Sequence, residues 1–339
     1  MHRLTLALAL LTVACSGGTP SRVETEAPAR DPGTASPTYA LHEWGLISVR
    51  GAGFEVSAGP GQRVMEAMTA DKPVLYVHTD DQFTLDLRVE PPAGLSVVEH
   101  YPQTDLSPLR WRARVGPHCA GAYPGVDDSR CPDGYCEAAE LPIYETPDAA
   151  CLEVGAVRAP LLFYRLAARG PAPALPLAVR WDGDAIVVEN ASLREPVGAL
   201  WRVRVDGATV RATRSAVPAV GQSVRLEPGA EPVGAARSTL RAELVEQGLT
   251  ETERDAFLRA WDTALFGPGA ADGDDGTAMD EADRPFDVLT DDRTTLAGPR
   301  LPDVLLYWLD RPSIDALAPL TAEPPPSEVH RAFLVRVAP

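Results

Sequence analysis

Histidine and acidic side chains with the chemistry of a catalytic or metal site gather in the first hundred residues. His42 and Glu43 are adjacent in the chain, so an imidazole and a carboxylate start close together. Such side chains act as general acids or bases and as metal ligands. Other side chains that strand pairing could bring near them are His78, Asp80, Asp81 and His100. The sequence therefore raises an acid/base or metal-ligand hypothesis centred on His42 and Glu43.

The pleat of a β-strand argues against one site made by both residues. Adjacent side chains of a strand point to opposite faces, so His42 and Glu43 share a site only if the strand bulges there. His42 and Trp44 share a face, which favours Trp44 as a core residue and His42 as its hydrogen-bonded neighbour. The candidate site consists of His42, Glu43, Trp44 and His78, with no catalytic residue assigned and no metal or cofactor expected.

Composition and motifs exclude several classes of protein. The chain carries 48 acidic and 31 basic residues, a formal net charge of -17. Without a positive field a nucleic-acid partner is not expected. The sequence also has no GxSxG, HExxH, Walker or dinucleotide-binding glycine motif, so it names no reaction.

Short strands dominate the chain from residue 40 onward. Phe83 to Glu90 alternates apolar and polar side chains, which is typical of a strand with one solvated face. Pro73 to His78 is a continuous apolar run, and the segment 79–82 between the two predicts a hairpin turn. Further strands are predicted at Leu95–Tyr101, Leu109–Val115, Leu161–Leu166, Leu177–Trp181, Ile186–Glu189, Trp201–Val205, Val304–Leu309 and Ala332–Val337. We expect a mainly β fold of antiparallel, sandwich-like sheets with a C-terminal helical hairpin, a β-rich α+β class.

The expected helices follow residue 238. Leu240 to Gln247 predicts a short helix that ends at Gly248, and Thr250 to Glu253 has the pattern of a capping box that opens a second helix. A pair of amphipathic helices packed on the sheet is favoured over a DNA-binding helix-turn-helix, because in the latter the acidic side chains of the helices would face DNA phosphates. Residues 271–293 are strongly acidic without EF-hand spacing, which favours a solvated loop and leaves calcium binding open.

The first residues have the order of a secretory signal. A positive start and an apolar run from Leu4 to Val13 precede small residues, and Leu11 to Cys15 resembles a bacterial lipoprotein processing site. Cys15 is then the lipidated residue, with ordinary cleavage near Ala14 or Gly18 as the alternative. Residues 16–38 have the composition of a flexible tether, and Ser16 after the cysteine favours the outer membrane.

Five cysteines are present, and four remain if Cys15 carries a lipid. In an exported chain they indicate two disulfides. Three pairings are open, and the turn residues 132–135 favour Cys131 with Cys136, which leaves Cys119 to pair with Cys151. The alternative is a zinc site of His118, Cys119, Cys131 and Cys136, whose spacing is not that of paired CxxC ligands.

Two segments resemble a known group of proteins. Residues 41–45 read Leu-His-Glu-Trp-Gly and residues 72–76 read Lys-Pro-Val-Leu-Tyr. With Gly248, Trp261 and the closing strands, they resemble bacterial exported proteins whose mature region opens with a His-Glu-Trp-Gly signature. The resemblance spans most of residues 40–339 and implies export, but it carries no activity and no site residues with it. Leu46, where the group often has Thr, and the four-cysteine excursion depart from the group's pattern.

These segments predict the organisation and role of the chain. We expect a signal peptide (1–14), a lipid-anchored tether (15–39), a β-rich domain (40–236) with a disulfide-stapled excursion (119–151), and a segment 237–339 with helical hairpin, acidic loop and closing strands packed on it. The expected function is that of a membrane-anchored envelope lipoprotein, a binding or structural module with an envelope protein or glycan as partner. The alternative is an exported hydrolase or metal-dependent enzyme centred on His42 and Glu43.

Overall fold

The computed structural model describes residues 36–50, 67–106, 108–121, 123, 137–168, 174–191, 197–206, 209–229, 231–266 and 303–339. Pro37–Pro339 forms one compact unit. Three of the cysteines considered above, Cys15, Cys131 and Cys136, lie outside the described residues, as does the acidic segment 271–293.

The largest sheet has nine strands in the order β15-β13-β12-β16-β18-β1-β2-β9-β4. Neighbouring strands in it are antiparallel except β1 and β18, which are parallel. Its strands are β1 (Ala40–Arg50), β2 (Ala67–His78), β4 (Leu95–Tyr101), β9 (Leu162–Ala168), β12 (Val197–Asp206), β13 (Thr209–Ala216), β15 (Glu231–Pro232), β16 (Asp303–Trp308) and β18 (Glu328–Ala338).

Two smaller sheets accompany it. One has the order β17-β3-β6-β7-β8 with β5 paired to β6, and the other the order β10-β11-β14. Their strands are β3 (Phe83–Val89), β5 (Asp105–Leu106), β6 (Leu109–Gly116), β7 (Cys151–Val154), β8 (Val157–Ala159), β10 (Leu177–Asp182), β11 (Ala185–Asn190), β14 (Ser223–Leu226) and β17 (Leu320–Glu323). The strand-rich, largely antiparallel architecture confirms the mainly β prediction.

One local prediction was wrong. The segment 79–82 is not a hairpin turn, because β2 pairs with β1 and β9 while β3 pairs with β17 and β6 in a different sheet. The segment instead bonds to the chain before β1: the Thr38 amide donates to Asp81 at 2.8 Å, and the Thr79 hydroxyl donates to the Thr38 carbonyl at 2.8 Å. A polar turn between two apolar runs thus connects two sheets rather than two paired strands.

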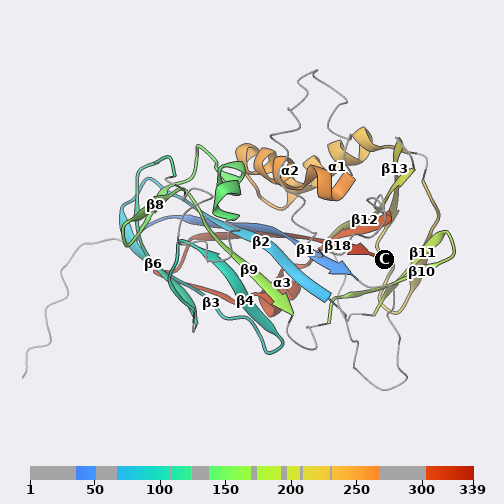
Figure 1. The fold of residues 1–339 in the computed structure, drawn as a ribbon, viewed down its shortest axis with the longest axis horizontal. Helices are drawn as coiled ribbons and strands as arrows, with labels where there is room; N and C mark the ends of the chain where they lie inside the picture. Colours follow the sequence, from blue (N-terminus) through green and yellow to red (C-terminus); the bar gives the residue numbers. More distant parts are fainter. Residues whose placement is uncertain are drawn as a thin grey trace, which may run out of the picture. The chain divides into compact units, whose positions relative to one another are not determined.

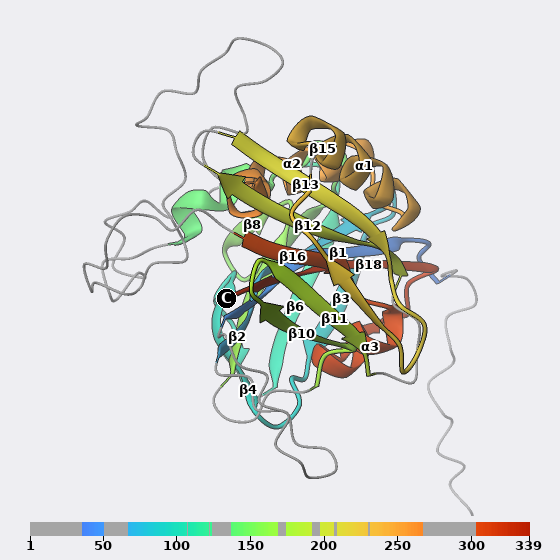
Figure 2. The same cartoon turned by 90° about the vertical axis from the view of Figure 1, so that its right-hand side faces the viewer.

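Helices cover one face of the nine-stranded sheet (Figure 1). They are α1 (Val233–Glu246) and α2 (Glu251–Phe266), accompanied by the 3-10 helix η1 (Glu137–Tyr144), whereas α3 (Arg311–Leu317) belongs to the opposite side. Figure 2 shows the same layering from the side, with α1 and α2 above β12 and β1, and with β3, β6, β10 and β11 below. Each face of the nine-stranded sheet therefore carries its own apolar layer.

Helix α1 begins at Val233, seven residues before the predicted start at Leu240. After Val233 its first two turns are small or polar, and Ala236 is the one residue of the helix buried before Leu240. Without apolar periodicity these turns give no helical signal, although Pro232 at the preceding position is compatible with a helix start. The predicted end is confirmed by Gly248, which follows the helix with a φ of 84°.

The segments 41–45 and 72–76 lie side by side on β1 and β2. His42 pairs with Tyr76 and Trp44 with Val74, and the register then shifts at a bulge between Trp44 and Leu46. A Cβ atom on Gly45 would lie 3.0 Å from the Pro73 Cα, so this close approach of the two strands favours glycine.

The closing strands are integral to the main sheet. β18 lies between β16 and β1, so residues 303–308 and 328–338 share a sheet with 40–50 and 67–78. In the described parts of the chain, no helix is both long and apolar enough to cross a membrane.

Candidate metal centre

His42 enters the site from the central strand β1. Only 5% of the residue is exposed. Its partner across the antiparallel pair is Tyr76, so His42 lies on the same face of the sheet as Tyr76. This face is the one that α2 covers, and the opposite face carries Glu43.

His78 reaches the same place from the end of β2. It lies two positions beyond Tyr76, and side chains two apart in a strand share a face. The His42 and His78 ring centroids are 4.4 Å apart. The two imidazoles thus meet because of strand pairing, as the sequence hypothesis for His78 required.

Glu253 comes from the first turn of α2 and is fully buried. The predicted capping box explains its position: the Thr250 amide donates to Glu253 Oε2 at 2.9 Å, and the Glu253 amide donates to Thr250 Oγ1 at 3.3 Å. The reciprocal bonds turn the carboxylate back over the helix start, toward the sheet. The helix N-terminus also favours a negative charge there.

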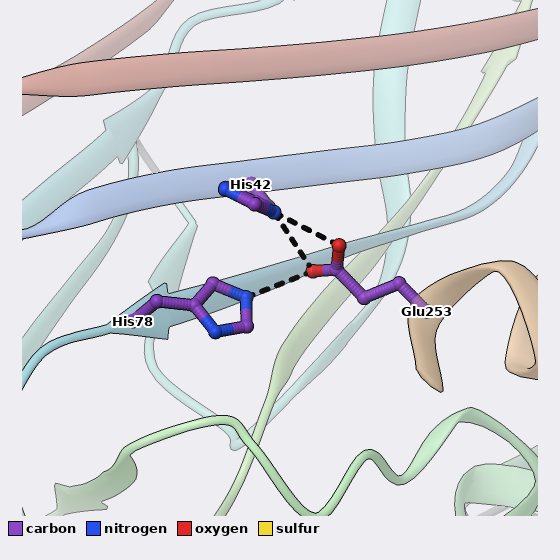
Figure 3. Close-up of side chains that lie close together, drawn as sticks. All are labelled: His42, His78 and Glu253. Carbon is purple, nitrogen blue, oxygen red and sulfur yellow. Dashed lines mark hydrogen bonds and ion pairs between the residues drawn. The ribbon is translucent and has the colours of Figure 1, made fainter. Parts of the chain in front are cut away.

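The three side chains point toward one another (Figure 3). His42 Nδ1 donates to Glu253 Oε2 at 2.8 Å, and His78 Nε2 donates to Oε1 at 3.0 Å. One ligand-type atom from each residue lies within 4.8 Å of the other two. We call His42, His78 and Glu253 the His–Glu–His cluster.

Hydrogen bonding fixes the charge state of the carboxylate. Burial alone would raise the pKa of Glu253, but the hydrogen bonds from His42 and His78 outweigh it and lower the pKa to about 2. Glu253 is therefore an ionised acceptor at neutral pH.

His78 lies between two hydrogen-bond acceptors. Its Nδ1 is 3.2 Å from the Asp148 carbonyl oxygen and its Nε2 faces the ionised Glu253. A neutral imidazole carries one N–H, so it can donate to one of the two acceptors only. Burial opposes the charged ring, yet the bond to Glu253 and the nearby negative charges raise its pKa. Either a second proton or a metal ion on Nε2 satisfies this geometry.

The donor set suits a transition-metal ion. Two imidazole nitrogens and one carboxylate are ligands that zinc uses, and three protein ligands leave a fourth position for water. Zinc–ligand bonds of about 2.0–2.2 Å at tetrahedral angles separate neighbouring ligand atoms by about 3.3 Å. The nitrogen–oxygen separations of 2.8 and 3.0 Å are shorter than this, so the side chains would have to move outward to hold the ion.

A third imidazole lies just outside the cluster. His330 on β18 pairs with His42 in the parallel register, and the two ring centroids are 4.7 Å apart. The His330 ring packs against Gly248, where a Cβ atom would come within 2.1 Å of His330 Nδ1. His330 is one-third exposed, and its Nε2 lies 3.3 Å from Glu328.

Glu43 belongs to a separate cluster on the opposite face. Tyr164 donates to its Oε1 at 2.7 Å, and Arg331 donates to its Oε2. Arg331 also donates to Asp315 at 2.6 Å and to the Ala318 carbonyl at 2.7 Å. Burial opposes the charge of Arg331, but Glu43 keeps its pKa raised. His42 and Glu43 thus serve different faces, as the pleat predicts.

Trp44 is a core residue beside the cluster, in agreement with its predicted role. Its ring packs against Tyr76, Tyr144 and Phe257 at centroid distances of 5.4–5.9 Å. Trp44 therefore packs β1 against β2 and α2, the three elements that carry the cluster residues.

The remaining predicted residues lie elsewhere. Asp80 and Asp81 follow β2 outside the cluster, and His100 bonds locally to the backbone of Thr104. The missed residue is Glu253, and the capping box was the available signal, because a capping-box glutamate turns back past its helix start. No pattern pairs residue 253 with residue 42.

Cys119 and Cys151 form the expected disulfide. The alternative zinc site is wrong in its use of Cys119, because a disulfide sulfur is not a thiolate ligand. His118 is engaged as well, its Nδ1 lying 2.6 Å from the Ala149 carbonyl oxygen. Cys131 and Cys136 lie outside the described residues, so their pairing stays a prediction.

Comparisons with known proteins give no family. No family model matches the chain, and no curated protein matches it. Among solved structures, the chain is similar to the Fcho1 Mu homology domain of Danio rerio, solved with a bound Eps15 peptide. The identity is 10%, the match covers 89% of this chain and 96% of that one, and the TM-score is 0.31. A similarity this low carries no argument about function.

Proposed function

We propose that this protein is a metal-binding module of the bacterial cell envelope whose centre is the His–Glu–His cluster. The observation that carries the proposal is the convergence of three ligand-type atoms within 4.8 Å, from β1, β2 and the first turn of α2. Three elements distant in sequence meet at one buried point with a nitrogen, nitrogen and oxygen donor set.

The ligand chemistry favours zinc. Imidazole ligands suit zinc, copper, iron and nickel, whereas calcium and magnesium take oxygen ligands. Glu253 supplies the negative charge that offsets a divalent cation, and His78 has its second nitrogen bonded to a backbone carbonyl, a common arrangement for zinc-binding histidines. A buried centre of this kind stabilises the packing of α2 on the sheet.

Calorimetric titration of the metal-free protein with Zn²⁺ tests the proposal. We expect one bound zinc per chain, and we expect His42→Ala to abolish binding. His100→Ala is the matched control, because His100 is also buried but its ring hydrogen-bonds to the Thr104 backbone and lies outside the cluster. Equal zinc binding by His42→Ala and wild type would refute the centre.

A hydrolytic role is the second candidate function, because three protein ligands leave one position for an activated water. Its test is hydrolysis of a chromogenic ester by the zinc-loaded protein. Turnover lost in Glu253→Gln and kept in His100→Ala would support it, and equal rates in all three proteins would refute it.

The proposed location in the envelope rests on the sequence of the first residues. Lipidation of Cys15 and the tether behind it would hold the module at a membrane, with the outer membrane favoured. Mass spectrometry of the processed N-terminus tests this. An acylated Cys15 is expected, and an unmodified N-terminus on membrane-associated protein would reject the anchor. We also propose that the chain is related to the bacterial exported proteins with the His-Glu-Trp-Gly signature.

The proposal includes two features of the fold, a sandwich-like packing of the sheets and a hairpin formed by α1 and α2. The apolar layer shared by the nine-stranded sheet and β3 and β6 supports a sandwich-like arrangement. The ion pairs Arg237–Asp262, at 2.6 Å, and Arg241–Asp255 join α1 to α2 and support a helical hairpin that presents Glu253 to the sheet.

A further inference from the structure

Residues 148–150 lie between η1 and β7, and Asp148 contacts His78 and Thr252 beside the His–Glu–His cluster. We propose that Asp148 is a positioning residue for the metal centre and that the Cys119–Cys151 disulfide holds it in place. The inference rests on the proposed metal-binding function and adds to it the residues that orient the ligands.

Asp148 contacts two of the three ligand-bearing elements. Its carbonyl oxygen accepts a hydrogen bond from His78 Nδ1 at 3.2 Å, at the end of β2. Its carboxylate accepts one from the Thr252 hydroxyl at 2.5 Å, in the first turn of α2. One residue thus connects the strand that carries His78 to the helix that carries Glu253.

Each contact orients one ligand. With Nδ1–H bonded to the carbonyl, the His78 ring directs Nε2 toward Glu253, where a metal ion would take the place of the proton. Thr252 precedes Glu253 in the capping box, so fixing its side chain fixes the helix start from which Glu253 projects.

Two hydrogen bonds and a disulfide hold this segment next to the cluster. The Ala150 amide donates to the Val77 carbonyl at 2.8 Å, next to His78. His118 Nδ1 donates to the Ala149 carbonyl at 2.6 Å. The disulfide then joins Cys151 to Cys119, the residue after His118. A covalent bond and two hydrogen bonds therefore hold the three residues that directly follow Asp148.

Removing groups that orient metal ligands typically weakens metal affinity about 10–100-fold. We expect Asp148→Ala, which keeps the carbonyl but loses the acceptor for Thr252, to weaken zinc binding about tenfold. Asp148→Asn keeps an oxygen acceptor at the same place and should bind zinc nearly as well as wild type. The double variant Cys119→Ser/Cys151→Ser should also bind about tenfold more weakly.

The experiment is a competition titration of the full chain, in which a chromophoric chelator and the protein compete for Zn²⁺. Cys131→Ser/Cys136→Ser is the matched control, since it removes the two cysteines between residues 119 and 151 and leaves Cys119 and Cys151 intact. Absorption spectra of the Co²⁺-loaded proteins report the ligand geometry directly, so they separate a positioning role from a loss of stability. We expect altered cobalt bands in Asp148→Ala and wild-type bands in Asp148→Asn.

The possible outcomes are distinct. Unchanged zinc affinity and unchanged cobalt bands in Asp148→Ala overturn the positioning role and leave the metal centre standing. If the cysteine double variant fails to fold, the Asp148 pair of variants still decides the question with the disulfide intact. A wild-type chain that binds neither ion overturns the metal centre and this inference together.

Discussion

Glu43 and Glu253 are two fully buried carboxylates on opposite faces of one sheet, and their partners differ in kind. Glu43 accepts hydrogen bonds from the guanidinium of Arg331 and the hydroxyl of Tyr164. Glu253 accepts them from the imidazoles of His42 and His78. Arginine stays charged at any physiological pH, whereas histidine gains or loses its proton near neutrality and binds metals when neutral.

The comparison shows that burial and satisfied hydrogen bonds do not by themselves identify a functional carboxylate. Arg331 holds Glu43 in a permanent ion pair with no group to exchange. The His–Glu–His cluster has a proton on each imidazole that a cation can replace. The chemistry of the partner therefore decides which cluster is structural and which can respond to its surroundings.

The largest expected effect comes from breaking the permanent pair. Arg331→Met leaves Glu43 buried without its cation, which should lower the free energy of unfolding by about 3–5 kcal/mol. Urea denaturation measures it, with Arg311→Met as control, because the Arg311 ion pair with Asp315 is half exposed and worth under about 1 kcal/mol. A loss no larger than the control's would contradict the structural role of the pair.

Zinc should stabilise the protein only through the cluster on the face of the sheet that α2 covers. At a zinc concentration about 100 times Kd, binding to the folded state adds about 2.7 kcal/mol to the free energy of unfolding. We expect this increment in wild type and in Tyr164→Phe, which alters the Glu43 cluster. It should vanish in Glu253→Gln, because glutamine keeps the capping box but loses the carboxylate ligand. An increment that survives in Glu253→Gln would place the ion elsewhere.

The two clusters should also differ in pH dependence when a chelator removes metals. Glu253 has a folded pKa of about 2 against an ordinary 4.5, so its stabilisation is present above pH 4.5 and is lost as the pH falls toward 2. The pKa of His78 is raised from 6.5, so its stabilisation is present below pH 6.5 and is lost as the pH rises through the raised value.

Wild type should therefore exceed Glu253→Gln in stability most between pH 4.5 and 6.5, by about 2 kcal/mol. Thermal melts across this range measure the difference. Tyr164→Phe should cost the same at each pH, because the tyrosine's pKa is raised well above its ordinary value of 10.0. A pH-independent difference between wild type and Glu253→Gln would show that His78 carries no charge in the cluster.

The smallest effect concerns the capping box. Thr250→Ala removes one half of the reciprocal bonds and should cost about 1 kcal/mol of stability in metal-free protein. It should also weaken zinc binding, because the start of α2 then holds Glu253 less firmly. Thr213→Ala, which removes an exposed hydroxyl bonded to the Glu227 carbonyl, is the control and should leave zinc binding unchanged.

Sequence patterns predicted features that depend on local spacing. The alternation in β3, the shared face of His42 and Trp44 and the capping box of α2 all follow from strand or helix periodicity. The convergence of His42 with Glu253 does not, because it depends on which face of the sheet α2 covers. The prediction of a hairpin between β2 and β3 was wrong for the same reason, since turn residues do not determine which strands pair.

The position of β18 has a consequence for how the chain reaches its native state. β18 is the common neighbour of β1 and β16, so residues 328–338 join the first strand to one that begins at residue 303. Until they have been synthesised, the sheet lacks its middle and leaves an apolar edge along β1 open to other chains. Such distant pairings fold slowly. The complete nine-stranded sheet therefore forms only after the last residues of the chain have been added.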